Sequence, residues 1–383
     1  MPWESRTVEK VREEFIQAVQ AGVRSKASLC REYGISRPTG DKWLARYNAG
    51  EGLSDRSSAA HRTPLRTPEN VEVEIVALRL LHPGIGAKKL KRILENRGLL
   101  MPCATTVNNI LHRYGCISPE ASAAATPNKR FQMDEPNDLW QADYKGHFPL
   151  NDGARCHPLN ILDDCSRFCL CSDAKENERF LPAKESFTKC FREYGLPKRL
   201  LCDNGNPWGT PQSTGFPAFE VWLMELGVMT IHGRIRHPQT QGKEERFNGS
   251  QTRELLKHRS FDNMEHAQAE LERYRQFYNE ERPHEALNME TPASVYRPST
   301  RKMPEQIRAW EYEHSEVCRV KDTGFMTYKG QGYFLSEAFR GKQVAIKASD
   351  EEHCYDILFR QFCIARLNIF ERCFVSKKIK MCK

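Results

Sequence analysis

The spacing of apolar residues changes near residue 139, and this change limits the fold more than any other feature of the chain. Before it, apolar residues recur at helical intervals. After it, short apolar runs alternate with longer helical stretches. The order that follows is three strands, a helix, a strand, a helix, a strand and then helices. This order predicts a mixed sheet covered by helices, within a multidomain α+β protein.

The second half of the chain divides into named segments. We expect strands over 139–148, 157–162, 167–172, 198–202 and 228–232, and helices over 180–194, 216–226, 240–256 and 264–279. These elements would form a catalytic core over 131–300. The segment 301–368 has alternating apolar residues and predicts a small β-barrel-like domain. Residues 369–383 are basic without a clear pattern and predict a frayed tail.

The first 118 residues carry two helix-turn-helix patterns. In the first, over 1–50, helices are expected at 8–21 and 26–33, and Ser36 is placed to cap a third helix. In the second, over 69–118, they are expected at 69–81, 87–97 and 107–114. Linkers are expected over 51–68 and 119–130. The residues expected to face DNA are Arg37, Thr39, Lys42, Arg46, Lys88, Lys89, Thr105, Thr106 and Asn108.

Charge is divided unevenly along the chain. The total is +8, but residues 1–118 hold 19 Lys and Arg against 12 Asp and Glu, and residues 301–383 hold 16 against 11. The middle is acidic, with 23 against 27. Basic segments suit a polyanion such as nucleic acid, although ordinary charge scatter is the simpler alternative. An acidic centre would repel that polyanion unless some carboxylates hold cations.

Several classes of protein are not expected. No apolar run approaches the roughly 20 residues of a membrane helix, and the N-terminal segment is too polar for a secretory signal. The 14 cysteines are therefore expected to be reduced thiols in a cytoplasmic, nucleoid-associated protein. Cys165, Cys169 and Cys171 lack zinc spacing and are better read as buried thiols.

Three acidic residues are candidates for a metal site. Asp143 lies in the first strand, Asp203 ends the strand over 198–202, and Glu245 lies one turn into a helix that follows Gly242. Such strand ends meet at one edge of an α/β sheet, and converging carboxylates repel one another unless divalent cations bind. Mg²⁺ or Mn²⁺, as two ions, would suit phosphoryl transfer. Taken singly, a strand-end aspartate is more often the cap of a turn or helix than a metal ligand. Glu244 is expected to face solvent.

Other side chains near these carboxylates have competing interpretations. Asp163 and Asp164 are expected to stabilise a hairpin turn rather than to bind metal. Lys243 and Arg246 could contact DNA phosphates or form a solvated helical face. His284 is expected to order a helix end. Trp208 could stack on an unpaired base or pack within its loop.

Five motifs together resemble the integrase-core transposases of bacterial insertion sequences, the DDE recombinases related to retroviral integrases. They are LWQADYKGHF, ILDDCSRF, LCDNG, RHPQTQGKEERFNGS and YNEERPHEALNMETPASVYRPS. The N-terminal segments GISRPTGDKWLARY and HPGIGAKKLKRILENRG resemble the paired helix-turn-helix modules of that group. The resemblance implies a ribonuclease-H-like core that binds Mg²⁺ or Mn²⁺. By position it makes Asp143, Asp203 and Glu245 the three catalytic carboxylates.

The chain departs from the family pattern in three places. The 41 residues between Asp203 and Glu245 exceed the usual interval, and NPWGTPQSTGF looks like a loop insertion. The N-terminus lacks the zinc module of retroviral integrases. The C-terminal segment FERCFVSKKIKMCK matches nothing in the family pattern.

The resemblance implies a DNA transposase that cleaves the ends of a mobile element and joins them to target DNA. Its partners would be double-stranded DNA, as element ends and target, and further copies of the chain in a homodimer or higher oligomer. Two alternatives stay open. One is a structure-specific nuclease of the same fold, and the other is a catalytically decayed DNA-binding regulator.

Overall fold

The computed structural model describes residues 7–56, 67–117, 133–203, 205, 207–209, 215–232, 242–313 and 315–382. The chain separates into two compact units, residues 1–66 and 67–383. Each unit is considered by itself below. Among the described residues, no helix is both long enough and apolar enough to cross a membrane.

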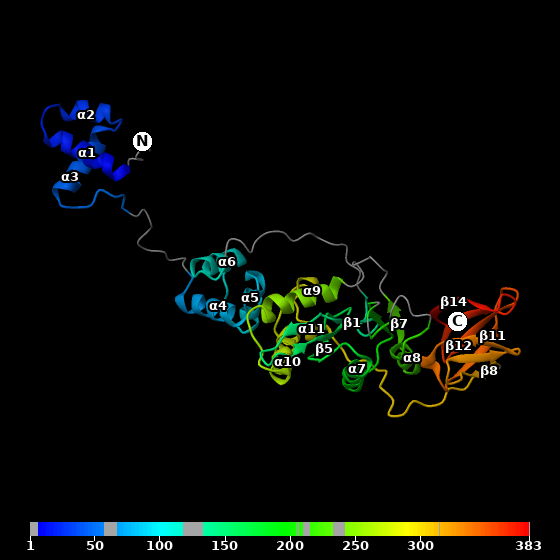
Figure 1. Ribbon diagram of the computed structural model, residues 1–383. Helices are drawn as coiled ribbons and strands as arrows, with labels where there is room; N and C mark the ends of the chain where they lie inside the picture. Colours follow the sequence, from blue (N-terminus) through cyan, green and yellow to red (C-terminus); the bar gives the residue numbers. More distant parts are fainter. Residues whose placement is uncertain are drawn as a thin grey trace. The chain divides into compact units, whose positions relative to one another are not determined.

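The first unit is a three-helix helix-turn-helix module (Figure 1). It contains α1 (Val8–Gln20), α2 (Lys26–Glu32) and α3 (Arg37–Asn48). Its core consists of Phe15, Ile16, Leu29, Cys30 and Trp43. The Ser36 side chain accepts a hydrogen bond from the Thr39 backbone N–H at 3.3 Å, which confirms it as the cap of α3.

The second helix-turn-helix segment belongs to the larger unit. It contains α4 (Glu69–Leu81), α5 (Ala87–Asn96) and α6 (Ala104–Arg113), and α6 begins three residues earlier than predicted. Its apolar residues share one hydrophobic cluster with Phe247, Leu255 and Phe277 of the core. The ring of His82 stacks on that of Phe277 at 3.8 Å between centroids. This segment is therefore packed against the core and is not a separate arm.

The core contains the predicted mixed sheet. Its strands are β1 (Trp140–Tyr144), β4 (Leu159–Asp163), β5 (Cys169–Asp173), β6 (Arg199–Cys202) and β7 (Met229–His232), in the order β5-β4-β1-β6-β7. β1 is antiparallel to β4 and parallel to β6. A separate short hairpin pairs β2 (Phe148–Pro149) with β3 (Arg155–Cys156), where one long strand was predicted.

The helices of the core include short elements that were not predicted. They are α7 (Phe180–Tyr194), α8 (Ala218–Glu225), α9 (Gly242–Gln251), α10 (Met264–Glu280) and α11 (Pro292–Val295), with a 3-10 turn, η4, over Glu285–Leu287. The predicted single helix over 240–256 is interrupted, because α9 continues into a π-helical turn, η3 (Thr252–Leu256). π-helical turns are rare overall, but those that occur inside α-helices are often found at functional sites.

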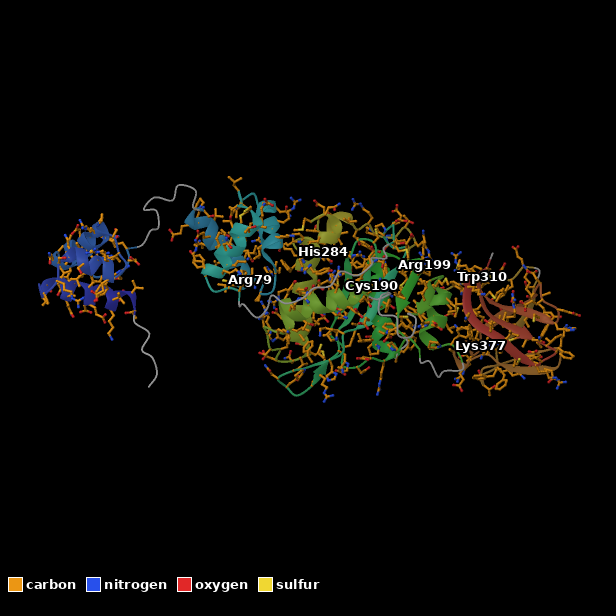
Figure 2. All side chains as sticks on the ribbon, turned by 90° about the horizontal axis from the view of Figure 1, so that it is seen from above. Arg79, Cys190, Arg199, His284, Trp310 and Lys377 are labelled. Carbon is orange, nitrogen blue, oxygen red and sulfur yellow. The ribbon has the colours of Figure 1, made fainter. Side chains whose placement is uncertain are left out.

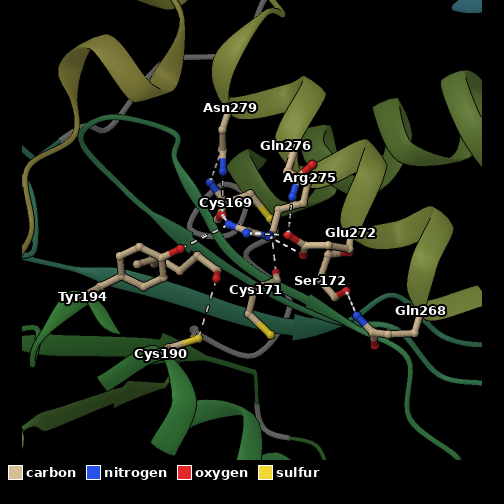
Figure 3. A network of polar contacts seen from close by, with 11 residues as sticks. Cys169, Cys171, Ser172, Cys190, Tyr194, Gln268, Glu272, Arg275, Gln276 and Asn279 are labelled. Carbon is tan, nitrogen blue, oxygen red and sulfur yellow. Dashed lines mark hydrogen bonds and ion pairs between the residues drawn. The ribbon is translucent and has the colours of Figure 1, made fainter. Parts of the chain in front are cut away.

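β5 is an edge strand of the sheet, and side chains of α10 cover that edge. The Asn279 amide accepts from the Cys169 N–H at 2.8 Å and donates to the Cys169 carbonyl at 2.9 Å, so it mimics a neighbouring strand (Figure 3). Arg275 donates to the same carbonyl at 3.3 Å and is held by Glu272. Covering an edge in this way prevents the strand from pairing with another chain.

The C-terminal domain is built on a five-stranded antiparallel sheet. Its strands are β8 (Glu316–Arg319), β11 (Gln343–Ala348), β12 (Cys354–Phe359), β13 (Phe362–Asn368) and β14 (Cys373–Met381). Between β8 and β11 in the chain, β9 (Phe325–Tyr328) and β10 (Gln331–Phe334) form a separate hairpin. A 3-10 turn, η5, follows it over Glu337–Phe339.

The prediction of a frayed tail over 369–383 is wrong. β14 pairs with β13, and the Lys377 ammonium donates to the carbonyls of Phe334 and Leu335 at 3.1 Å each. Figure 2 shows Lys377 and Trp310 within this domain. The strand was missed because Phe374 and Ile379, which pack against the domain core, do not follow a strict alternation: the pairing of β14 with β13 shifts register, and lysines lie between them.

Candidate catalytic site

The two predicted aspartates lie at the same level of two neighbouring parallel strands, Asp143 within β1 and Asp203 directly after β6. Gln141 of β1 pairs with Leu201 of β6, and Asp143 and Asp203 each lie two residues further along. Side chains two residues apart on a strand face the same side. The structure therefore brings Asp143 and Asp203 together at the carboxyl ends of β1 and β6.

The helix that carries the two glutamates is tied directly to Asp143. The Asn248 amide on α9 donates a hydrogen bond of 2.9 Å to the Asp143 carboxylate. Glu245 precedes Asn248 by three residues, so both occupy one face of the helix. Glu245 is exposed, and its charge contributes to raising the pKa of Asp143. Glu245 is thus placed near Asp143 and open to solvent.

A buried network of hydrogen-bonded polar side chains holds Asn248 in place from the side of the sheet. The Asn160 amide donates to the Asn248 side-chain oxygen at 2.8 Å, and Ser172 donates to Asn160 at 2.8 Å. Gln251 donates to Ser172 at 2.9 Å, which closes the network between α9 and the sheet. Asn160 is the partner of Asp143 in the antiparallel pairing of β1 and β4. The network therefore fixes the position of α9 over the first aspartate.

The carboxylates of the site perturb one another. Burial, followed by the charge of Asp203, raises the pKa of Asp143 to about 7, while the hydrogen bond from Asn248 opposes this shift. Glu178 and Glu245 raise the pKa of Asp143 further. Such accumulation of like charge is what cation binding would relieve.

The prediction that Glu244 faces solvent is wrong. Only 1% of Glu244 is exposed, and neither oxygen of its carboxyl group has a hydrogen-bond partner among the described residues. It belongs to the buried stripe of the helix with Phe247 and Gln251, three and seven residues later. Burial, and then the charges of Asp143 and Asp203, raise the pKa of Glu244 well above its usual value.

Asp203 is held by its own loop and by a histidine. The Gly205 backbone N–H donates to the Asp203 carboxylate at 2.9 Å. The His232 ring contacts the Asp203 carbonyl at 3.0 Å through Nδ1 and the buried Glu220 at 2.5 Å through Nε2. Burial is the largest single influence and lowers the pKa of His232, but the hydrogen bond and charge of Glu220, together with the carbonyl and charge of Asp203, raise it overall. The two contacts of the ring hold the residue that follows β6 in place.

The carboxylate oxygens of the site are the kind of ligand that a hard divalent cation prefers, but the described side chains do not surround a common centre. Among the described residues, no three His, Cys, Asp or Glu side chains are arranged to hold a metal ion. Three observations nevertheless fit Mg²⁺ or Mn²⁺: the oxygen ligands, their accumulated negative charge and the two buried Glu244 oxygens that lack partners.

Most of the residues expected to face DNA are accessible to it. Arg37, Lys42, Lys88, Thr105 and Arg246 are exposed, and Thr39, Thr106 and Asn108 are half-buried. Two of the half-buried residues bond within their own helix start: Thr39 to Ser36 at 2.8 Å, and Thr106 to Cys103 at 3.2 Å. These eight residues stay candidates for DNA contact.

The three others are bonded or partly covered within the protein. Arg46 donates to the carbonyls of Gly52 and Ser54 at 2.6 and 3.1 Å, and its guanidinium lies 4.8 Å from the Trp43 ring. Lys89 is half-buried, and burial followed by the charge of Arg282 lowers its pKa to about 8. Lys243 ion-pairs with Asp164, whose side chain is fully buried. We therefore do not assign these three side chains to DNA.

The turn interpretation of Asp163 and Asp164 is supported by their contacts. Asp163 accepts hydrogen bonds from the backbone N–H groups of Asn137 and Ser166 at 2.7 and 2.8 Å. Asp164 accepts from the Met133 N–H at 2.7 Å and from the Gln141 amide at 2.6 Å. Both carboxylates are thus occupied by the hairpin and the segment before β1.

Two further residues adopt the packing roles expected of them. Trp208 is 1% exposed, and its ring contacts those of Phe187, Phe219 and Tyr144, so it packs rather than stacking on a base. His284 orders the chain after α10, where its backbone N–H donates to the Glu290 carbonyl at 3.0 Å. The His284 side chain lies within the larger unit in Figure 2.

The cysteines are thiols, as predicted. Cys165, Cys169 and Cys171 are buried.

Several residues of the site were missed from the sequence. Asn248 could have been found, because a polar residue three positions after Glu245 shares its helix face. Asn160, Gln251 and His232 carry no such local signal, since their roles depend on pairing between distant strands. The sequence therefore located the acidic residues and missed the polar side chains that hold them.

Family models match the chain in the same order as its structural parts. A helix-turn-helix domain model matches residues 11–61 and a homeodomain-like domain model matches residues 39–111. Two integrase core domain models match residues 133–238 and 226–292. The C-terminal domain model of IS481 family transposases matches residues 315–372.

Curated relatives share the core region. The uncharacterized 31.7 kDa protein of insertion element IS407 from Burkholderia multivorans is 29% identical over 158 residues, or 41% of this chain and 54% of that protein. The uncharacterized 39.2 kDa protein of insertion element IS476 from Xanthomonas euvesicatoria is 28% identical over 160 residues, or 41% and 44%. The chain thus spans about half the length of these relatives.

A solved structure also matches at low similarity. A chain of the simian T-cell lymphotropic virus intasome, solved in complex with PP2A regulatory subunit B56 gamma, is 17% identical with a TM-score of 0.37, covering 74% of this chain and 95% of that chain. The family models carry the assignment. With helix-turn-helix domains first, an integrase core in the middle and an IS481-type domain at the end, the family models together indicate an insertion-sequence transposase with an integrase-type core.

Proposed function

We propose that the chain is a DNA transposase, a polynucleotidyl transferase that cleaves the ends of a mobile element and joins them to target DNA. The observation that carries the proposal is the convergence of Asp143 and Asp203 on adjacent parallel strands, under a helix that Asn248 ties to Asp143. The integrase core matches cover this whole arrangement.

Asp143, Asp203 and Glu245 would hold Mg²⁺ or Mn²⁺, as two ions. When bound, such ions stabilise the attacking and leaving oxygens of a phosphoryl transfer. Asn248 orients the Asp143 carboxylate, and Gly205 and His232 fix Asp203. The exposed side of α9, with Glu245 and Arg246, leaves room for a DNA strand.

Two reactions follow from this chemistry. In the first, a water oxygen attacks a phosphorus at the element end, and the bond to the 3′-oxygen breaks to leave a 3′-hydroxyl. In the second, that hydroxyl attacks a phosphorus of target DNA and displaces a 3′-oxygen there. Neither reaction needs a covalent bond between protein and DNA, so no nucleophilic serine or tyrosine is assigned.

The helix-turn-helix segments would bind the element ends. Arg37 and Lys42 are exposed on α3, and Thr105 is exposed at the start of α6, the helices that follow the turns. Such positions suit contacts with phosphates and base edges. Synapsis of two ends would require at least two copies of the chain, in a symmetric assembly.

A two-step assay tests this function. The full-length protein is incubated with Mn²⁺ and a labelled duplex that carries the inverted repeat flanking its gene, together with a target plasmid. We expect a nick at the repeat boundary, followed by labelled plasmid. Nicking without labelled plasmid would indicate the nuclease alternative, and binding without nicking would indicate the decayed regulator.

A further inference from the structure

Glu244 is an anomaly that the proposed triad does not explain. Its carboxyl group is almost fully buried, and neither oxygen has a hydrogen-bond partner among the described residues. Burying an unpaired carboxyl group is costly, and buried polar groups in native proteins are nearly always satisfied by protein, water or an ion. An unsatisfied group at this place therefore points to a ligand.

The surroundings of Glu244 show which ligand it could be. Its neighbours include Asp143 at the end of β1 and Asp203 after β6, both close enough to add to its electrostatic perturbation. Burial is the main cause of the raised pKa of Cys202, but Glu244 is among the carboxylates that add to it. Glu244 thus lies over the ends of the same two strands that carry the aspartates.

Glu244 and Glu245 approach this site from different sides of α9. Glu245 shares the accessible face with Asn248, whereas Glu244 belongs to the buried stripe with Phe247 and Gln251. Consecutive residues of a helix differ by about 100° in direction. One glutamate is therefore open to solvent and the other lies between the helix and the sheet.

We infer that Glu244 is a fourth carboxylate ligand of the divalent-cation site, supplied from its buried side. The inference rests on the proposed function, because it assumes that Asp143 and Asp203 bind the cation. A cation there would provide the partner that both Glu244 oxygens lack. It would also neutralise the charge that accumulates among the four carboxylates.

Direct measurement of Mn²⁺ binding tests this assignment without reference to activity. Free Mn²⁺ is quantified by its electron paramagnetic resonance signal in titrations of the full-length protein, and thermal melts are recorded with and without Mn²⁺. The variants are Glu244→Gln, Glu244→Met, Asp143→Asn and, as a matched control, the exposed Glu176→Gln.

We expect Glu244→Met to melt at a higher temperature than wild type without metal, because an unpaired buried carboxyl group is gone, whereas Glu244→Gln keeps an unpaired polar group and should melt close to wild type. With Mn²⁺ both variants should bind at least about tenfold more weakly and gain less thermal stability. If the metal-free melting temperature rises while Mn²⁺ binding is unchanged, Glu244 is only a buried acid and the inference is wrong. If Asp143→Asn also binds Mn²⁺ normally, the proposed function itself fails.

Discussion

Asn248 donates a 2.9 Å hydrogen bond to Asp143 across the gap between α9 and β1. The bond joins a helix residue to a strand residue 105 positions earlier. It sets the distance between the strand that supplies the first aspartate and the helix that supplies Glu245. The geometry of the site therefore depends on an amide that takes no part in the chemistry.

Removing this amide should weaken the site and leave the fold intact. We expect Asn248→Ala to lower the rate of DNA cleavage by about 10- to 100-fold, as is usual when a group that orients a metal ligand is lost. Cleavage rates at several Mn²⁺ concentrations, recorded with a thermal melt, measure the effect. Asn96→Ala, at an exposed position of α5, is the control. Unchanged cleavage by Asn248→Ala would show that Asp143 is oriented by other means.

Asp143 should make the stability of the metal-free protein depend on pH. Its pKa is raised to about 7 in the folded protein, from an ordinary value of 3.8, mainly by burial and then by Asp203. Between these values the folded state binds a proton that the unfolded state does not. Stability contributed by this proton is present at low pH and is lost as the pH rises towards 7.

Thermal melts of metal-free protein between pH 4.5 and 8 measure this loss. We expect the melting temperature of wild type to fall over that range and that of Asp143→Asn to fall less. The difference should be about 2–4 °C for each kcal/mol of pH-dependent stability that Asp143 contributes. An identical pH profile for the two proteins would contradict the assigned environment of Asp143.

Breaking the buried ion pair of Glu254 and Arg282 from one side should strongly destabilise the fold. Both side chains are 4% exposed, and they approach to 2.7 Å between η3 and the end of α10. We expect Arg282→Met alone to cost about 3–5 kcal/mol in the free energy of unfolding, because it leaves Glu254 buried without its partner. The double variant Glu254→Leu with Arg282→Met should recover most of that loss. Urea denaturation compares the three proteins, and a double variant less stable than Arg282→Met would refute this account.

Two basic residues of α3 should behave differently. Lys42 is exposed, so Lys42→Ala should weaken DNA binding and reduce the salt dependence by about one counterion, without changing the melting temperature. Arg46 bonds to the carbonyls of Gly52 and Ser54, so Arg46→Ala should lower the melting temperature. Fluorescence anisotropy at several salt concentrations, with melts of both variants, separates the two effects. Equal loss of stability in both would remove the distinction.

The sequence predicted the elements of the core well, because each is a local pattern. The helix over 180–194 matches the observed bounds, and so does the helix over 69–81 that precedes the core. The exposure of Glu244 was mispredicted for a physical reason. A charged residue is assigned to solvent by default, and only the packing of α9 on the sheet shows that Glu244 lies in the buried stripe with Phe247.

Contacts between distant segments could not be read from local patterns. Lys89 and Arg46 look like solvent-exposed basic residues in their helices, yet each packs against another segment. The docking of α4–α6 on the core depends on surfaces such as that between His82 and Phe277, which lie far apart in the sequence. Basic side chains on a helix therefore predict DNA contact only where no other segment covers that face.

The most direct test of the account is single-turnover cleavage of a duplex carrying the element end, in Mn²⁺, by variants of the three proposed carboxylates. We predict that Asp143→Asn, Asp203→Asn and Glu245→Gln each lose on the order of 10³-fold or more in rate. Combining two of them should cost little beyond the worse single change, since residues that act as a unit fail together. The exposed Glu176→Gln should cleave like wild type. Near-normal cleavage by all three carboxylate variants would contradict the proposed catalytic site.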